Sequence, residues 1–285
     1  MKKLLFLLII LFICSITYSE TEIEAVDENI PPLWNFGLFN SWAQIPHYRG
    51  SDEYNNYLVP IPYFVYRGKV IQTERETVKG IIYQTDNFVS EISFHGNPPV
   101  DSDNKAREGM GELEPLIEAG PAVKWYFLGR KKINMYLQAA VRGVSSVDTD
   151  KGIDFKYEGI HSSVNLIYKR SSLFGMENFR TGLSFGIENT DKNYNSFFYD
   201  VKQEYVTEER HFYESEGGYA GKTISGSIVY KINKDLSFAS FFRWENIDDA
   251  VFEESPLVKE KNNHILGMAL IWNIKDSKEN SRAKY

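Results

Sequence analysis

Three observations predict a transmembrane antiparallel β-barrel of about twelve strands, with about ten as the alternative. Hydrophobic residues alternate with polar or small ones in segments of about ten residues. Tyr, Phe and Trp make up 15% of a chain whose mean hydropathy is negative, at −0.37. Short turns and long polar loops also follow one another along the chain. This combination is typical of an outer-membrane barrel with aromatic girdles outside and a polar lumen inside.

The N-terminus predicts export. Two lysines precede an almost unbroken apolar run at residues 4–16, and Thr17 and Ser19 are small residues at the positions that define cleavage. We predict a signal peptide at residues 1–19 and a mature chain that begins at Glu20. The apolar run is shorter than the roughly 20 residues that a spanning helix needs, and no later stretch approaches that length.

Charge and cysteine content exclude several classes of function. Loss of Lys2 and Lys3 with the signal changes the formal net charge from −7 to −9. A chain this acidic, without a basic cluster, is not expected to bind nucleic acid. The only cysteine, Cys14, lies in the apolar run, so the mature protein is expected to have no disulfide and no thiolate metal site.

The alternation is clearest in the second half of the chain, where each segment has one apolar row and one row of polar or small residues. A soluble β-sandwich would turn such an apolar row inward. Here the small residues gather on the polar face, as in a crowded barrel interior, so the apolar row is expected to face lipid. Segments 117–127 and 134–142 show the same split. The apolar rows are Phe179, Leu183, Phe185 and Ile187; Ile224, Ile228, Tyr230 and Ile232; Leu236, Phe238, Phe242 and Trp244; and Leu266, Met268, Leu270, Trp272 and Ile274.

The connections predict the topology. Strands are expected to run from about residues 36–45 to residues 265–274, with Thr190 to Tyr219 as one external excursion containing local hairpin structure. Residues 20–33 and 275–285 are then a periplasmic N-terminal segment and a periplasmic tail of the barrel domain, which spans 20–285. Short periplasmic turns are predicted at 67–69, 129–132 and 233–235, and long external loops at 47–56, 96–112 and 248–263.

A proline pair interrupts one predicted strand. Pro60 and Pro62 lie inside the apolar run from Tyr57 to Tyr66. Because proline removes a ladder donor, we expect a bulge or locally loosened pairing there.

The predicted lumen contains charges of both signs. Mixed signs indicate a cross-linked, partly filled interior, whereas a ring of one sign would indicate an ion-selective pore. The predicted lumen residues are Glu118, Lys124, Arg142, Lys169, Arg180, Glu188, Lys231, Arg243 and Glu245.

No residue is assigned a catalytic, cofactor-binding or metal-binding role, and no cofactor is expected. His161 is predicted to face the lumen with Ser163 and Asn165, and the other histidines are interpreted as exposed loop residues. Loop acids could bind divalent cations that bridge lipopolysaccharide. The remaining histidines are His47, His95, His211 and His264, and the loop acids are Asp52, Glu53, Asp248, Asp249, Glu253 and Glu254.

Several stretches resemble the family of outer-membrane proteins named for the MltA-interacting protein, also called the MipA/OmpV family. They are PHYRGSDEYNNYLVPIPYFVYRG at residues 46–68, GMGELEPLIEAGP at 109–121, the pair Gly218 and Tyr219, and ESPLV at 254–258. They occur in the family's order and span most of the mature chain. The hydrophilic tail beyond Ile274 departs from the family's pattern.

The resemblance implies a non-enzymatic protein of the cell outer membrane in a diderm bacterium. It also implies a scaffold for peptidoglycan remodelling that brings a lytic transglycosylase, a murein hydrolase, together with a penicillin-binding protein, a murein synthase. The other expected partners are outer-membrane lipid and lipopolysaccharide. A passive porin-like channel for small solutes is the alternative, and a lipid-modifying enzyme is the third.

Overall fold

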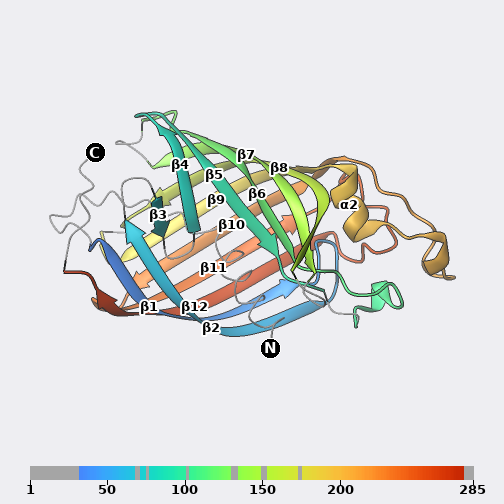
Figure 1. Cartoon of the computed structure of the whole chain (residues 1–285), viewed down its shortest axis with the longest axis horizontal. Helices are drawn as coiled ribbons and strands as arrows, with labels where there is room; N and C mark the ends of the chain where they lie inside the picture. Colours follow the sequence, from blue (N-terminus) through green and yellow to red (C-terminus); the bar gives the residue numbers. More distant parts are fainter. Residues whose placement is uncertain are drawn as a thin grey trace.

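The computed structural model describes residues 32–67, 71–74, 77–100, 103–129, 134–148, 153–172 and 175–278. Twelve antiparallel strands form a closed barrel in which sequence neighbours pair and β1 meets β12, so the predicted fold and strand number are confirmed (Figure 1). The strands are β1 (Trp34–Pro46), β2 (Tyr54–Arg67), β3 (Ile71–Glu74), β4 (Thr77–Gln84), β5 (Phe88–Asn97), β6 (Leu116–Trp125), β7 (Met135–Asp148), β8 (Asp154–Arg170), β9 (Phe179–Thr190), β10 (Gly218–Lys231), β11 (Leu236–Asn246) and β12 (Asn262–Asp276).

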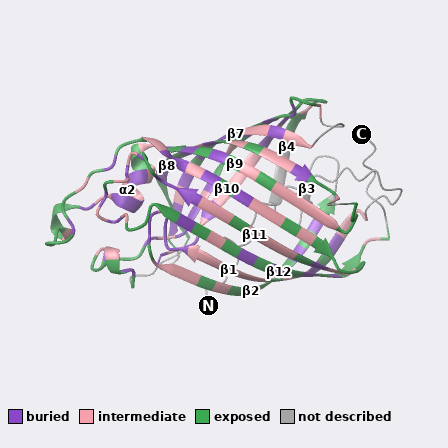
Figure 2. Cartoon of the chain, turned by 180° about the vertical axis from the view of Figure 1, so that it is seen from behind, coloured by how far each residue is buried: buried purple, intermediate pink, exposed green. Residues whose placement is uncertain are grey.

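Burial alternates along the strands as predicted. In β9 the side chains of Leu183, Phe185 and Ile187 are exposed, whereas Glu188 is buried. The same alternation continues through β10, β11 and β12 (Figure 2). Because period-two alternation sends successive side chains to opposite faces, the apolar rows form an outer belt and the small and charged rows fill the lumen.

Aromatic side chains on this belt gather near the short-turn end of the strands. Tyr66, Trp125, Tyr230 and Trp272 are all exposed there. Phe88 stacks on Trp125, with ring centroids 6.2 Å apart and planes inclined by 4°. Such a row is what the membrane interface favours.

The long connections lie at one end of the barrel. They include residues 47–53, 98–115, 191–217 and 247–261 (Figure 1). In chain order, with the β7–β8 connection as the third, we call them the first, second, fourth and fifth outer loops. The excursion from Thr190 to Tyr219 is confirmed as one loop, and an isolated antiparallel bridge joins Val201 to Tyr213 within it. This loop also holds the helix α2 (Lys192–Tyr199), which the sequence analysis did not predict.

A glycine seats α2 against β8. The Asp191 side chain caps the helix by accepting from the Tyr194 amide at 2.9 Å. Gly159 of β8 has a φ of +126°, and a Cβ there would lie 2.2 Å from Asp191 Oδ1 and 2.6 Å from the Tyr194 nitrogen. The close approach of helix and strand therefore requires glycine at this position.

The bulge predicted at the proline pair is wrong for the β1–β2 ladder, whereas the pairing is loosened on the other edge of the same strand. β2 pairs with β1 through Pro60 and Pro62 without a register shift. Since proline cannot donate, an uninterrupted ladder requires that the lost donors are those directed away from β1. On that side the β2–β3 ladder of the described residues comprises only Tyr66↔Thr73 and Arg67↔Gln72.

The last strand is longer than predicted. The tail was expected from Lys275, but β12 continues to Asp276 because β1 begins at Trp34 and offers partners to both residues. Residues 1–31 and 279–285, and with them the predicted signal peptide and most of both predicted periplasmic segments, lie outside the described residues. In the described part of the chain no helix has the length and apolar character needed to cross a membrane.

Candidate functional site

An apolar cluster joins the outer loops across the mouth of the barrel. It includes Leu116 and Val144 of the paired strands β6 and β7, and Ala220 of β10, which lies three strands further around the wall. Phe252 of the fifth loop stacks on Tyr199 of α2, with ring centroids 3.9 Å apart and planes inclined by 6°. We call this cluster the cap. Its buried members are Tyr48, Val100, Leu113, Leu116, Val144, Phe198, Tyr199, Val201, Ala220, Ile247, Ala250, Phe252 and Leu257.

Hydrogen bonds to backbone carbonyls hold the cap loops to one another. The Tyr48 hydroxyl of the first loop donates to the Leu257 carbonyl of the fifth at 2.7 Å. The Tyr199 hydroxyl donates to the Arg49 carbonyl at 2.8 Å, and the Arg107 guanidinium of the second loop donates to the Phe198 carbonyl at 2.7 Å. Four loops are thus fixed together by directed contacts as well as by apolar burial.

A buried ionic network lies directly beneath the cap. Arg49 reaches from the first loop into the lumen, where it pairs with Glu188 of β9 and, at 3.1 Å, with Glu245 of β11. Arg243 of β11 contacts the same two carboxylates, each at 2.8 Å. His161 of β8 extends the network, because its Nδ1 lies 2.8 Å from Glu118 Oε2. The network, which we call the Arg49 network, connects β6, β8, β9, β11 and the first loop.

Electrostatics favour the charged form of Arg49 within this network. Burial acts to lower the pKa of the guanidinium, but the carboxylates of Glu188 and Glu245 outweigh burial and raise the pKa well above its usual value. The first loop is therefore held by an ion pair that persists across the physiological pH range.

A second set of charged groups lies nearer the short turns. Lys124 Nζ of β6 lies 2.9 Å from Glu91 Oε2 of β5, and both side chains are almost fully buried. The Arg142 guanidinium of β7 donates to the Ser93 hydroxyl at 2.9 Å. These contacts cross-link β5 to its neighbour β6 and, across β6, to β7 inside the barrel, as the mixed lumen charges predicted.

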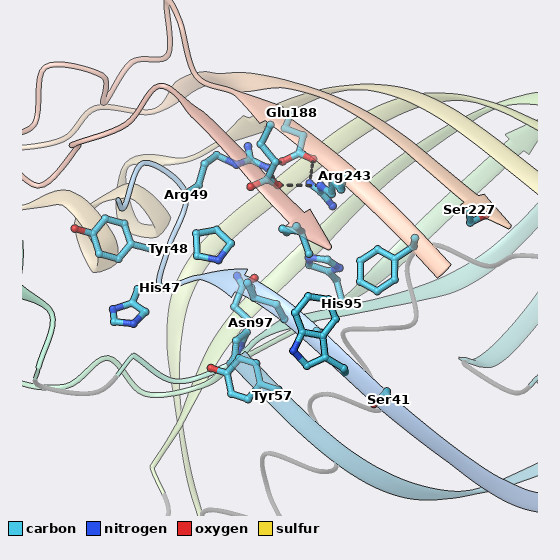
Figure 3. A pocket seen from close by; sticks show the side chains of 18 of the residues that line it. Ser41, His47, Tyr48, Arg49, Tyr57, His95, Asn97, Glu188, Ser227 and Arg243 are labelled. Atoms are coloured by element: carbon cyan, nitrogen blue, oxygen red, sulfur yellow. Dashed lines mark hydrogen bonds and ion pairs between the residues drawn. The ribbon is translucent and has the colours of Figure 1, made fainter. Parts of the chain in front are cut away.

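Two cavities remain between these groups. One, of about 170 Å³, lies against the Arg49 network and is lined by Phe39, Val59 and Phe241 together with His95 and Asn97 (Figure 3). The other, of about 90 Å³, is lined mainly by polar side chains that include Gln138, Ser163 and Asn165. Both hollows are bordered by largely buried charged groups of the described lumen, among them His161, Glu188 and Arg243.

Most predicted lumen residues are confirmed. Glu118, Lys124, Arg142, Lys169, Glu188 and Glu245 are buried, and Arg180 and Arg243 face inward. Lys231 is the exception, because it ends β10 at the rim and is exposed to solvent.

The histidine predictions are partly wrong. His161 faces the lumen and His211 and His264 are exposed, as expected. His47 is buried and hydrogen-bonded to Asn104 at 3.0 Å. His95 lies in β5 and faces the lumen, with its ring centroid 6.2 Å from that of His161. His95 was predicted to be an exposed loop residue; the alternation of Glu91, Ser93 and His95 in β5 is the sequence signal for its inward orientation.

The lumen position of Arg49 was not predicted, because Arg49 lies in the polar stretch 47–56 that is predicted to be an external loop. Two of the loop acids, Asp248 and Glu253, lie on either side of Lys261, at 4.0 and 3.1 Å from its Nζ. Within the described ranges, no three His, Cys, Asp or Glu side chains group closely enough to hold a metal ion.

A closed antiparallel barrel with an apolar outer belt and a polar, charged lumen defines a β-barrel protein of the outer membrane. The sequence also identifies the family within this class. Residues 41–274 match the family described as MltA-interacting protein MipA, and the chain belongs to this family.

Other comparisons are distant. No curated protein matches the sequence. Among solved structures, the chain is similar to a Salmonella typhi OmpF complex with daunomycin, at 11% identity and a TM-score of 0.36, covering 93% of this chain and 72% of that one. It is also similar to the CymD monoaromatic hydrocarbon channel, at 8% identity and a TM-score of 0.36, covering 89% and 90%. A bacterial polysaccharide outer membrane secretin gives 8% identity and a TM-score of 0.37, covering 87% and 100%.

Proposed function

We propose that this chain is a non-enzymatic outer-membrane protein that docks peptidoglycan-remodelling enzymes and does not conduct bulk solute. One observation carries the proposal: the cap and the Arg49 network together span the outer mouth of the barrel. A porin needs a continuous water-filled lumen, and a mouth crossed by packed aromatic rings and buried ion pairs does not supply one.

The family description suggests the partner. Its name describes a protein that interacts with MltA, a lytic transglycosylase, and the resemblance adds a penicillin-binding protein as second partner. Such enzymes act on peptidoglycan, so they would meet the short-turn end of the barrel. The β10–β11 turn at that end exposes Lys234, and the chain terminus follows β12 there.

Co-purification tests the docking role. The mature barrel, folded in detergent, is immobilised and mixed with purified MltA-type transglycosylase and a bifunctional penicillin-binding protein. Retention of both enzymes is expected, with reduced retention when residues 279–285 are removed. Phe252→Ala, at the opposite end, is the matched control and is expected to retain both. Failure of the intact barrel to retain either enzyme would overturn the docking role.

A passive channel is the second candidate, because two cavities lie along the lumen below the cap. Planar-bilayer recording separates the candidates. We expect no conductance from the folded barrel under conditions where a porin conducts. Stable unitary conductance together with failed co-purification would favour the channel over the docking role.

An enzymatic role has less support. His161 is engaged by Glu118, and in the described part of the chain no serine hydroxyl is hydrogen-bonded to a histidine, the contact that would activate a serine nucleophile. Lipid hydrolysis or acyl transfer that is abolished by His47→Ala or His264→Ala would contradict the non-enzymatic assignment.

A further inference from the structure

Part of the lumen wall is apolar beside the larger of the two cavities. The side chains of Phe39, Val59 and Phe241 belong to β1, β2 and β11, and all three line this cavity of about 170 Å³. A barrel lumen is ordinarily polar, and the wall formed by β5 to β9 follows that pattern with buried charged side chains. The apolar surface beside the cavity therefore departs from the usual lining of a lumen.

The Phe241 ring lies flat enough against the wall to leave the space in front of it open. Gly267 of β12 makes this possible, because a Cβ at that position would overlap the ring. Phe241 lines the cavity and is only partly buried, and Phe39 is partly buried in the same way. Their accessible surface therefore faces the cavity, and an aromatic ring gains free energy there beyond the burial of its area.

A hydrogen-bonding group faces the same cavity from β5. His95 lines it together with Asn97, whose amide nitrogen donates to the Tyr194 hydroxyl at 3.4 Å (Figure 3). Among the described residues, none hydrogen-bonds to a ring nitrogen of His95, and its ring contacts that of His161 with centroids 6.2 Å apart. An uncharged imidazole has one donor and one acceptor nitrogen, so His95 offers a partner to a polar group in the cavity.

The ionic groups that border the cavity are paired with one another. Arg49 and Arg243 both contact the carboxylates of Glu188 and Glu245. Because these pairs are shielded from bulk water, a ligand with a net charge would add an unbalanced charge to a poorly solvated site. The cavity therefore favours an uncharged ligand.

The volume of the cavity limits such a ligand to a single ring. An engineered protein cavity of about 150 Å³ with apolar walls stays dry and binds benzene. The cavity beside Phe39 and Phe241 is slightly larger, at about 170 Å³. It therefore has room for one six-membered ring with a small substituent.

We propose that this cavity is a binding site for a small uncharged aromatic molecule with one hydrogen-bonding substituent, of which phenol is the simplest example. The ring of the ligand lies against Phe39 and Phe241, and its substituent hydrogen-bonds to His95. This goes beyond the docking role and does not depend on it, because no periplasmic enzyme takes part in the binding.

Calorimetric titration with phenol tests the site. The barrel is folded into lipid nanodiscs, so that no detergent fills the cavity, and empty nanodiscs measure partitioning of phenol into lipid. Saturable binding to the native barrel is expected. Ala239→Phe places a ring in the cavity and is expected to weaken binding by about tenfold or more, because two rings cannot occupy the same space. Ala139→Phe is the matched control, since Ala139 of β7 is exposed, and it should bind phenol as the native barrel does.

Heat-modifiable migration in detergent gels shows whether each variant has folded. Ala269→Leu narrows the same cavity from β12 and replaces Ala239→Phe if the larger side chain prevents folding. The proposal is refuted if the native barrel shows no saturable binding, or if a folded cavity variant binds phenol as tightly as the native barrel.

The role of His95 is tested with toluene, a ring of similar size without a hydrogen-bonding group. His95→Phe is expected to weaken phenol binding by about three- to tenfold, which corresponds to one hydrogen bond, and to leave toluene binding unchanged. His264→Phe on β12 is the control, because His264 is exposed, and neither affinity should change. An unchanged ratio of the phenol and toluene affinities in His95→Phe contradicts the proposal, and retention of the enzymes in co-purification has no bearing on that ratio.

Discussion

Arg49 donates a hydrogen bond to Glu188, which follows it by 139 residues in the chain. The contact joins the first outer loop to the lumen wall near the outer end of β9. Arg49 also pairs with Glu245 of β11, and Arg243 of β11 pairs with both carboxylates. The side chain of one loop residue therefore connects β9 and β11.

Arg49→Ala is expected to lower the free energy of unfolding by about 3 kcal/mol, because it leaves two buried carboxylates with one cation fewer. Urea unfolding in lipid vesicles, followed by tryptophan fluorescence, measures the change. Lys156→Ala is the control, since its ion pair with Glu158 has a lysine that is 77% exposed, and a change below about 0.5 kcal/mol is expected. Equal effects of the two substitutions would contradict the structural role of Arg49.

Phe252→Ala is expected to open the cap. Loss of a fully buried ring that stacks on Tyr199 destabilises the local packing by about 3–4 kcal/mol. Limited digestion with proteinase K should cut the fourth and fifth loops faster while the strands stay intact. Phe212→Ala removes an equal ring that is 49% exposed in the fourth loop, and its digestion pattern should remain that of the native protein.

Gly267→Leu is expected to impair barrel assembly. A Cβ at this inward position would lie 1.9 Å from the Phe241 ring, so the ring and the wall would have to move. Gly226→Leu on β10 is the matched control, because its nearest contact would be an ordinary 3.6 Å from Leu183 Cδ2 on the outer surface. The folded fraction in a heat-modifiability gel should fall for the first variant only; normal folding of Gly267→Leu would show that the lumen is less crowded than the structure indicates.

Alkaline pH is expected to loosen the cap. Burial raises the pKa of Tyr48 and of Tyr199 above the usual value. The opened loops therefore lose these protons first, and the stability that is fully present below about pH 10 declines as the pH rises further. Proteinase K digestion between pH 8 and pH 11 measures the decline.

The double variant Tyr48→Phe, Tyr199→Phe is the control for this effect. It cannot ionise at either position, so its digestion rate should depend less on pH, although loss of two hydrogen bonds raises the rate at every pH. An unchanged pH dependence would assign the alkaline transition to other groups.

The sequence by itself determined the barrel, the lipid-facing and lumen-facing rows, and the long excursion after Thr190. Each of these depends on local order, because alternation with a period of two directs side chains to opposite faces wherever a strand pairs. Short stretches of sequence also predicted the family to which the chain belongs. The lumen position of Glu188 and Arg243 followed from the same alternation.

The partners of the lumen charges and the packing across the outer mouth could not be predicted from sequence order. Arg49 and Tyr48 lie in a loop that reads as polar and exposed, and their burial depends on partners more than a hundred residues away. The continuous β1–β2 ladder through Pro60 and Pro62 likewise depends on which edge of β2 pairs closely. Periodicity fixes the face of a residue, but the closure of the barrel brings distant loops together, and that closure converts an apparent surface loop into the cap.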